Sequence, residues 1–101
     1  MTTNYDVAIV GAGPAGIFAS LELCDAGLDV LLLDKGRAID ARVCPVQRGS
    51  ECCMLCSPCH LVSGFGGAGA FSDGKLTLST QIGGRLRELI GLDQAKALVD
   101  F

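Results

Sequence analysis

The sequence predicts an α/β fold that opens with a strand, a helix and a second strand. Three observations predict it: a short apolar run at residues 5–10 that a glycine ends, a helix-forming segment at residues 14–26, and a second apolar run at residues 29–33. A helix between two buried strands carries the chain back across the sheet, so we expect the strands to be parallel. Residues 1–36 should therefore form a βαβ nucleotide-binding unit of Rossmann-like type.

The helix of this unit has end signals and an apolar face. Pro14 suits the first helical turn, where its missing N–H group has no helical partner, and Gly27 suits the left-handed residue that ends a helix. Four residues recur at helical spacing, namely Ile17, Leu21, Cys24 and Leu28. We expect this face to be buried, with Cys24 as a core thiol.

The remaining residues are expected to add only part of a domain. Residues 37–63 read as a Cys-rich loop, and residues 64–101 as a glycine-rich loop, a hairpin turning at Asp73-Gly74, a helix over 84–90 and a last helix capped by Asp93. A complete doubly wound fold needs about five or six strands. The sequence thus predicts one partial domain, the N-terminal part of a longer protein.

Composition excludes several classes of partner. The chain has 11 acidic and 8 basic residues and a net charge of −3, without the Lys/Arg cluster that a nucleic-acid surface needs. Its apolar runs are too short for a membrane span, and its start does not resemble an export signal. We therefore expect a cytoplasmic protein without nucleic-acid or membrane partners. In that reducing compartment the six cysteines favour thiol, metal or redox roles over structural disulfides.

The turn between the first strand and the helix matches the dinucleotide-binding fingerprint G-x-G-x-x-G. The six consecutive residues are Gly11, Ala12, Gly13, Pro14, Ala15 and Gly16. The first glycine permits the tight turn, the second lets the backbone approach a pyrophosphate, and the third lets helix and strand pack closely. The helix start offers free N–H groups and a positive dipole end to the phosphates. The alternative is a tight strand-to-helix turn without a ligand.

An acidic residue stands at the end of the second predicted strand, where dinucleotide-binding folds carry one. Asp34 stands 23 residues after Gly11, where a carboxylate accepts hydrogen bonds from ribose hydroxyls. The same carboxylate would repel a ribose 2′-phosphate, which disfavours NADP at this position. The alternative is an acid that caps or solvates the loop.

Cysteines gather in the loop that follows. Cys53, Cys56 and Cys59 have spacings that allow thiolates to converge on a zinc ion or an iron–sulfur cluster, and Cys44 could supply a fourth ligand. His60 is another possible zinc ligand. Redox-active thiols, or thiols without a special role, remain the alternatives.

A second glycine-rich stretch spans residues 64–69. It is either a flexible connector or a backbone suited to close approach by a planar or anionic ligand. Arg42 and Lys75 are the nearest cations that could meet a phosphate or a flavin carbonyl, or they are solvated surface charges.

Taken together, five segments resemble a family of bacterial and archaeal FAD-dependent dehydrogenases. They are residues 5–16, residues 34–36, the Arg-Val-Cys-Pro element at 42–45, the cysteine cluster, and the Gly-Gly-Ala-Gly to Lys-Leu run at 66–76. The resemblance implies noncovalent FAD, with its pyrophosphate over residues 11–16 and its adenosine ribose at Asp34. It further implies that Arg42 and the loop of Gly66, Gly67, Ala68 and Gly69 approach the pyrophosphate and flavin side of the cofactor. Lys35, in the matching segment at 34–36, is a further candidate cofactor-binding residue.

The function expected from this resemblance is that of an FAD-dependent oxidoreductase in the full-length protein, with NADH or NADPH as a possible electron donor. The flavin would carry the redox chemistry, so no catalytic acid or base is assigned to these residues. The 101 residues alone are expected to be inactive. The alternatives are an NAD-binding unit, or a nucleotide-binding module whose cysteines sense redox state or hold a metal.

Overall fold

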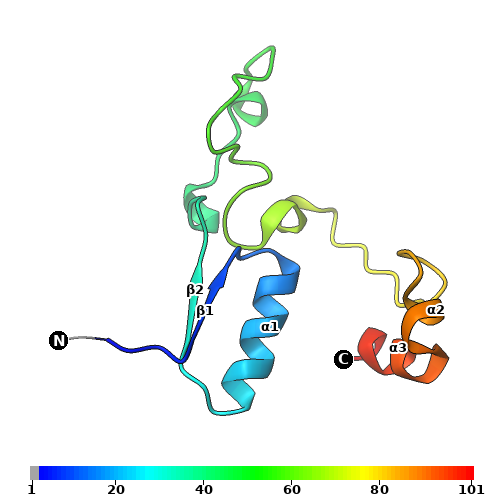
Figure 1. Ribbon diagram of the computed structural model, residues 1–101. Coiled ribbons are helices and arrows are strands. Elements are labelled where there is room, and N and C mark those ends of the chain that lie inside the picture. Colours follow the sequence, from blue (N-terminus) through cyan, green and yellow to red (C-terminus); the bar gives the residue numbers. More distant parts are fainter. Residues whose placement is uncertain (1–2) are drawn as a thin grey trace.

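The N-terminal third of the computed structural model, which describes residues 3–101, is a βαβ unit. Strand β1 (Val7–Val10) leads into helix α1 (Pro14–Asp25), which returns the chain to strand β2 (Val30–Leu33) (Figure 1). The strands are parallel, with Val7 opposite Val30 and Val10 opposite Leu33. Gly27 ends the helix at a positive φ of 83°. These findings confirm the predicted parallel βαβ unit.

Parallel pairing brings the carboxyl ends of β1 and β2 to one edge of the sheet. There the N–H group of Gly11 donates a 2.7 Å hydrogen bond to the carbonyl oxygen of Leu33. The residues that follow the strands, Gly11 and Asp34, therefore start side by side. Ligands of open α/β sheets bind at this edge.

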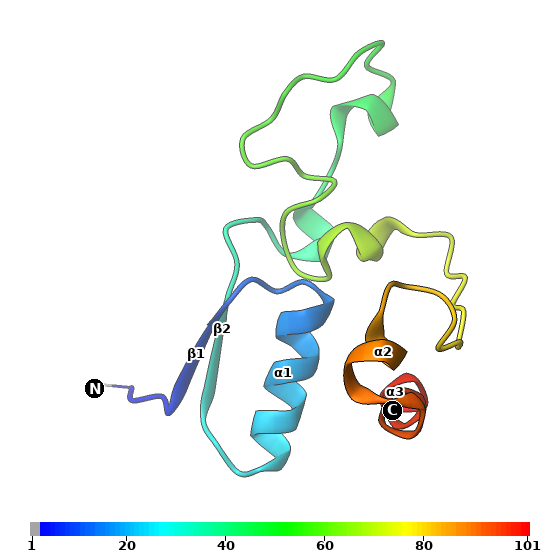
Figure 2. The same ribbon diagram turned by 45° about the vertical axis from the view of Figure 1, so that its right-hand side comes forward.

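The Cys-rich loop leaves this edge as an excursion, seen in green at the top of Figure 1. It contains two short 3-10 helices, η1 (Ile39–Ala41) and η2 (Pro45–Arg48). The chain then returns to the βαβ unit, where a third 3-10 helix, η3 (Gly67–Phe71), lies beside the start of α1 in both views (Figures 1 and 2).

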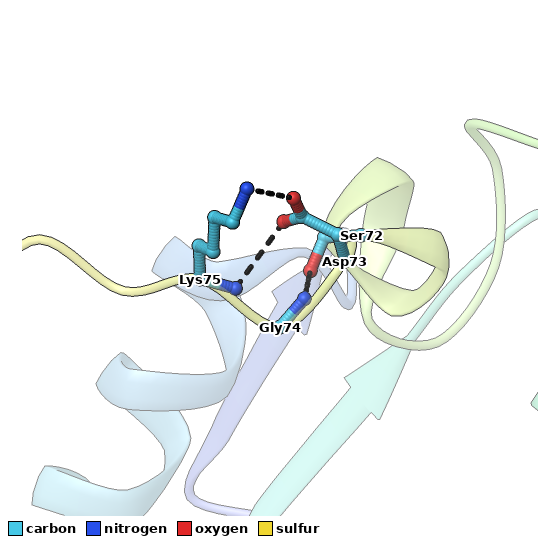
Figure 3. Close-up of polar contacts among 4 residues, drawn as sticks. All are labelled: Ser72, Asp73, Gly74 and Lys75. Atoms are coloured by element: carbon cyan, nitrogen blue, oxygen red, sulfur yellow. Dashed lines mark hydrogen bonds and ion pairs between the residues drawn. The ribbon is translucent and has the colours of Figure 1, made fainter.

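The predicted hairpin after η3 is wrong. The only paired strands among residues 3–101 are β1 and β2. Residues 73–79 form neither a strand nor a backbone turn, although Gly74 has a φ of 77°. Side chains bond the backbone there, because Ser72 Oγ accepts from the Gly74 N–H group and Asp73 accepts from the Lys75 N–H group and pairs with its ammonium (Figure 3). Turn chemistry alone therefore does not create a strand pair when neither flank finds a partner.

Two helices follow, α2 (Leu86–Ile90) and α3 (Leu92–Val99), and lie on the α1 side of the molecule (Figure 2). The predicted cap at Asp93 is also wrong. Gly91 ends α2 and is itself the N-cap of α3, which puts Asp93 inside the first turn. An acid there still interacts favourably with the positive end of the helix.

The described residues form an open arrangement with little buried surface. Their radius of gyration is 17.0 Å, against about 13 Å for a compact chain of this length. The buried residues between 3 and 101 are Ala12, Arg42, Gly64 and Ala95. Cys24 is exposed, which corrects the expectation of a core thiol. The predicted apolar face is not buried either, because Leu21 is 50% and Leu28 is 37% exposed.

No helix within residues 3–101 has the length and apolarity that crossing a membrane requires.

Candidate nucleotide-binding site

The turn after β1 has the geometry that the fingerprint predicts. Gly11 adopts a φ of 111°, which L side chains rarely tolerate. A Cβ atom at Gly16 would collide with the carbonyl oxygen of Gly11, so only glycine lets the helix lie this close to the strand. A Cβ atom at Gly13 would meet nothing within 4 Å. The first and third glycines therefore serve the fold, whereas the space at Gly13 is open.

Helix α1 presents unpaired donors at this opening. Its first helical hydrogen bond runs from the Ile17 N–H group to the Gly13 carbonyl oxygen, at 3.0 Å. The N–H groups of Ala15 and Gly16 precede that bond and have no acceptor within the helix, and no side chain caps them. Together with the positive end of the helix dipole, they suit an anion such as a pyrophosphate.

Asp34 lies at the same opening, tied to the backbone on both sides. Its Oδ2 accepts from the Ala12 N–H group at 2.8 Å, and its Oδ1 accepts from the Gly36 N–H group at 2.7 Å. These two bonds, helped by the Gly64 N–H group and the Arg42 charge, lower the pKa of Asp34. Its side chain therefore stays ionised. A carboxylate has further lone pairs, so Asp34 can still accept hydrogen bonds from a ribose.

The second glycine-rich stretch docks directly on the fingerprint. The Gly66 N–H group donates to the carbonyl oxygen of Ala12 at 2.8 Å. Gly66 and Gly67 have positive φ values of 85° and 59°, and a Cβ atom at Gly67 would lie 3.4 Å from the Cα atom of Gly13. The stretch is thus an ordered second wall beside the opening at Gly13, and not a loose connector.

Arg42 lies underneath this wall instead of facing the opening. It is 3% exposed. Its guanidinium donates to four carbonyl oxygens, those of His60, Leu61, Phe65 and Gly67, at 2.7 to 2.9 Å. It also stacks over the Phe71 ring, 4.8 Å from the centroid. The sequence placed Arg42 near the cofactor but did not reveal that its donors are used by the protein.

Two glycines that the sequence showed only as members of longer segments allow the two loops to touch. A Cβ atom at Gly36 would collide with the backbone of Ser63 and Gly64. Gly64 has a φ of 119°, and a Cβ atom there would collide with the Arg37 carbonyl oxygen. The signal that could have found them is the presence of glycine at both ends of the Cys-rich loop, where two chain segments must approach closely.

The predicted metal ligands do not come together in this structure. Within the described residues, no three His, Cys, Asp or Glu side chains are grouped so as to hold a metal ion. Cys44, Cys53, Cys56 and Cys59 are free thiols. The His60 ring is engaged elsewhere, with its Nδ1 atom 2.9 Å from the Val43 carbonyl oxygen.

Cys59 differs from the other thiols in its electrostatic surroundings. The N–H groups of Leu61 and Val62 favour its thiolate, and the Arg42 charge adds a smaller effect, so its pKa is lowered. It is also exposed. A thiol with these two properties is expected to react faster than its neighbours.

The predicted cofactor residues thus fall into two sets. The structure gathers residues 11–16, Asp34 and Gly66-Gly67 around one opening. It places Arg42 behind the wall, Lys35 exposed beside Asp34, and Ala68 and Gly69 in η3.

Comparison with known proteins finds a family match over part of the chain. Residues 4–43 match the family described as "FAD binding domain". No solved structure shows a significant match.

Three relatives illustrate the similarity. An uncharacterized protein of Clostridium beijerinckii is 44% identical over 69 residues, which are 68% of this chain and 13% of the relative. A digeranylgeranylglycerophospholipid reductase of Methanosarcina mazei is 43% identical over 53 residues, which are 52% of this chain and 13% of the relative. A vinyl phenol reductase of Lactiplantibacillus plantarum is 53% identical over 34 residues, which are 34% of this chain and 7% of the relative.

The chain therefore spans only a small part of the length of these relatives. The family match and the parallel βαβ unit with its glycine turn lead to one conclusion: residues 4–43 are similar to the FAD binding domain family, and residues 7–33 have the βαβ arrangement of an incomplete Rossmann-like domain.

Proposed function

We propose that this chain is the FAD-binding portion of a flavin-dependent oxidoreductase. One observation carries the proposal: the open space at Gly13 is bordered by the donors at the start of α1, by the ionised Asp34 and by the Gly66-Gly67 backbone. FAD supplies the electron-transfer chemistry when bound, and the protein binds, orients and tunes it.

Each part of the opening has a role toward one portion of the cofactor. The backbone of residues 11–16 would hold the pyrophosphate, because Gly13 lets it approach and the Ala15 and Gly16 N–H groups can donate to it. Asp34 would accept from the adenosine ribose. Lys35 is exposed next to it and adds positive charge at the rim. The backbone of Gly66, Gly67, Ala68 and Gly69 would form the second wall.

The names of two relatives favour electron flow from a donor onto an organic acceptor, because both are called reductases. We propose a reduced nicotinamide, NADH or NADPH, as the donor. The acceptor and the residues that bind it belong to parts of the protein beyond these residues, so the 101-residue chain alone is expected to be inactive. We propose the reducing cytoplasm as its location, where the six cysteines of the sequence are expected to remain thiols.

The test is an absorption spectrum of the full-length protein, purified without oxygen and scanned before and after addition of NADH or NADPH. Flavin bands that bleach on reduction are expected, and the nicotinamide that bleaches them identifies the donor. Protein that shows no flavin bands after incubation with FAD would refute the proposal.

The reactive surroundings of Cys59 favour a second candidate, a nucleotide-binding module whose thiols sense redox state. Elemental analysis of the same sample tests the related metal-site hypothesis. Stoichiometric iron or zinc would show that the cysteines rearrange around a metal, and its absence would leave them as thiols.

A further inference from the structure

We infer that Arg42 is a positioning residue of the FAD site, which holds the second glycine wall against the pyrophosphate turn without contacting the cofactor. The inference rests on the proposed function. It replaces the expectation, drawn from family resemblance, that the charge of Arg42 approaches the pyrophosphate.

The acceptors of Arg42 are spread along the returning half of the loop. His60 and Leu61 lie next to the last cysteine, whereas Phe65 and Gly67 belong to the glycine-rich stretch. Only a planar group with donors on several edges can serve carbonyl oxygens that lie so far apart in sequence. The guanidinium therefore fixes the shape of the whole segment from residue 60 to residue 67.

The burial of Arg42 indicates that its charge is used within the protein, by this segment. A buried cation requires hydrogen bonds, and the carbonyl oxygens and the Phe71 ring are its neutral partners. Nearly all N–H donors of Arg42 are occupied by these bonds. A phosphate that took their place would leave backbone carbonyl groups buried without partners, which is costly.

The segment that Arg42 fixes is the one that touches the fingerprint. Gly66 donates to Ala12, and Gly67 packs against Gly13. A substitution of Arg42 should therefore alter the opening at Gly13, because it displaces Gly66 and Gly67. Its charge also helps keep Asp34 ionised, but that contribution is smaller than those of the backbone N–H groups.

Substitution of Arg42 by lysine and by methionine distinguishes a positioning role from direct contact between the charge and the cofactor. Arg42→Lys keeps the charge but loses the planar fork, and Arg42→Met keeps the aliphatic stem and loses both. Positioning predicts that the two variants weaken FAD binding to a similar degree, about tenfold to a hundredfold. Direct contact with the pyrophosphate predicts instead that Arg42→Lys stays close to wild type.

The experiment titrates the FAD-free full-length protein with FAD, at low and high salt, following the quenching of flavin fluorescence. Arg48→Met is the matched control, because Arg48 is exposed and lies in the same loop. We expect the control to bind like wild type and the dissociation constants of both Arg42 variants to rise with unchanged salt dependence. An Arg42→Lys protein with wild-type affinity, or a salt dependence lost in Arg42→Met, would overturn the inference.

Hydrogen exchange of the Gly66 amide in the FAD-free protein tests the same inference before any cofactor binds. The bond to Ala12 protects this amide, and we expect faster exchange in both Arg42 variants but not in Arg48→Met. If the Arg42 variants do not fold, Phe71→Leu removes only the aromatic partner and should raise the FAD dissociation constant about two- to tenfold. Unchanged affinity in Phe71→Leu and unchanged Gly66 exchange would each contradict the inference, whereas wild-type protein that binds no FAD would contradict the proposed function.

Discussion

Two glycines of the fingerprint should respond in opposite ways to the same added methyl group. At Gly16 a Cβ atom collides with the Gly11 carbonyl oxygen, a backbone atom that cannot swing away as a side chain can. Forcing a methyl group into such a site typically costs about 1–3 kcal/mol. We therefore expect Gly16→Ala to lower the free energy of unfolding of the FAD-free protein by about that amount.

At Gly13 the same methyl group should not disturb the fold. The residue has a φ of −78°, which alanine adopts without strain, and its Cβ atom meets nothing within 4 Å. Alanine is a somewhat poorer N-cap than glycine, but it also reduces the entropy of the unfolded chain, and these effects of about 0.5–1 kcal/mol offset each other. Gly13→Ala should therefore unfold like wild type, yet raise the FAD dissociation constant about tenfold to a hundredfold because the methyl group occupies the pyrophosphate space.

The assay for both variants is urea unfolding of the FAD-free full-length protein, followed by FAD titration of the folded samples. Each variant is the control for the other, because the substitution is the same and the positions lie three residues apart. Gly13→Ala protein with unimpaired FAD affinity would refute the placement of the pyrophosphate. Gly16→Ala protein as stable as wild type would refute the close packing of helix and strand.

Three further outcomes are expected. The pKa of Asp34 is lowered, so its hydrogen bonds stabilise the folded state at pH values above the ordinary carboxyl pKa, and this stabilisation is lost as the pH falls through the lowered pKa. In Asp34→Asn, the stability measured by unfolding should therefore lose part of its dependence on acid pH. Identical pH profiles for variant and wild type would contradict this. Because the pKa of Cys59 is lowered, iodoacetamide at neutral pH should label Cys59 faster than Cys52, which is also exposed. Peptide mass spectrometry follows the labelling, and equal rates would contradict the effect of the N–H groups near Cys59. Gly64→Ala combines a φ of 119° with a backbone collision, so urea unfolding should show a loss of more than about 1 kcal/mol, and a neutral effect would contradict the packing of the two loops.

The βαβ unit was predictable because its signals are local. Glycine at positions 11 and 27 and proline at position 14 mark the element ends, and periodicity marks the helix between them. The contact between Asp34 and the fingerprint follows from parallel pairing, which brings both strand ends to one edge.

The role of Arg42 was not predictable in the same way. A single arginine in a polar stretch looks like a solvated charge, since its acceptors are backbone carbonyl groups, which sequence patterns do not show. The exposure of Cys24 has a related cause. Helical spacing identifies an apolar face, but it does not say which element covers it. The prediction of a hairpin was wrong because strands on either side of an Asp-Gly turn form only where tertiary structure stabilises their pairing.

Calorimetric titration of the FAD-free full-length protein with FAD, and separately with NAD⁺, tests most directly whether this is an FAD site. We expect saturable binding of FAD at one site, and much weaker binding of NAD⁺. Tight binding of NAD⁺ with no binding of FAD would contradict the proposed function, and would make the opening at Gly13 a nicotinamide nucleotide site.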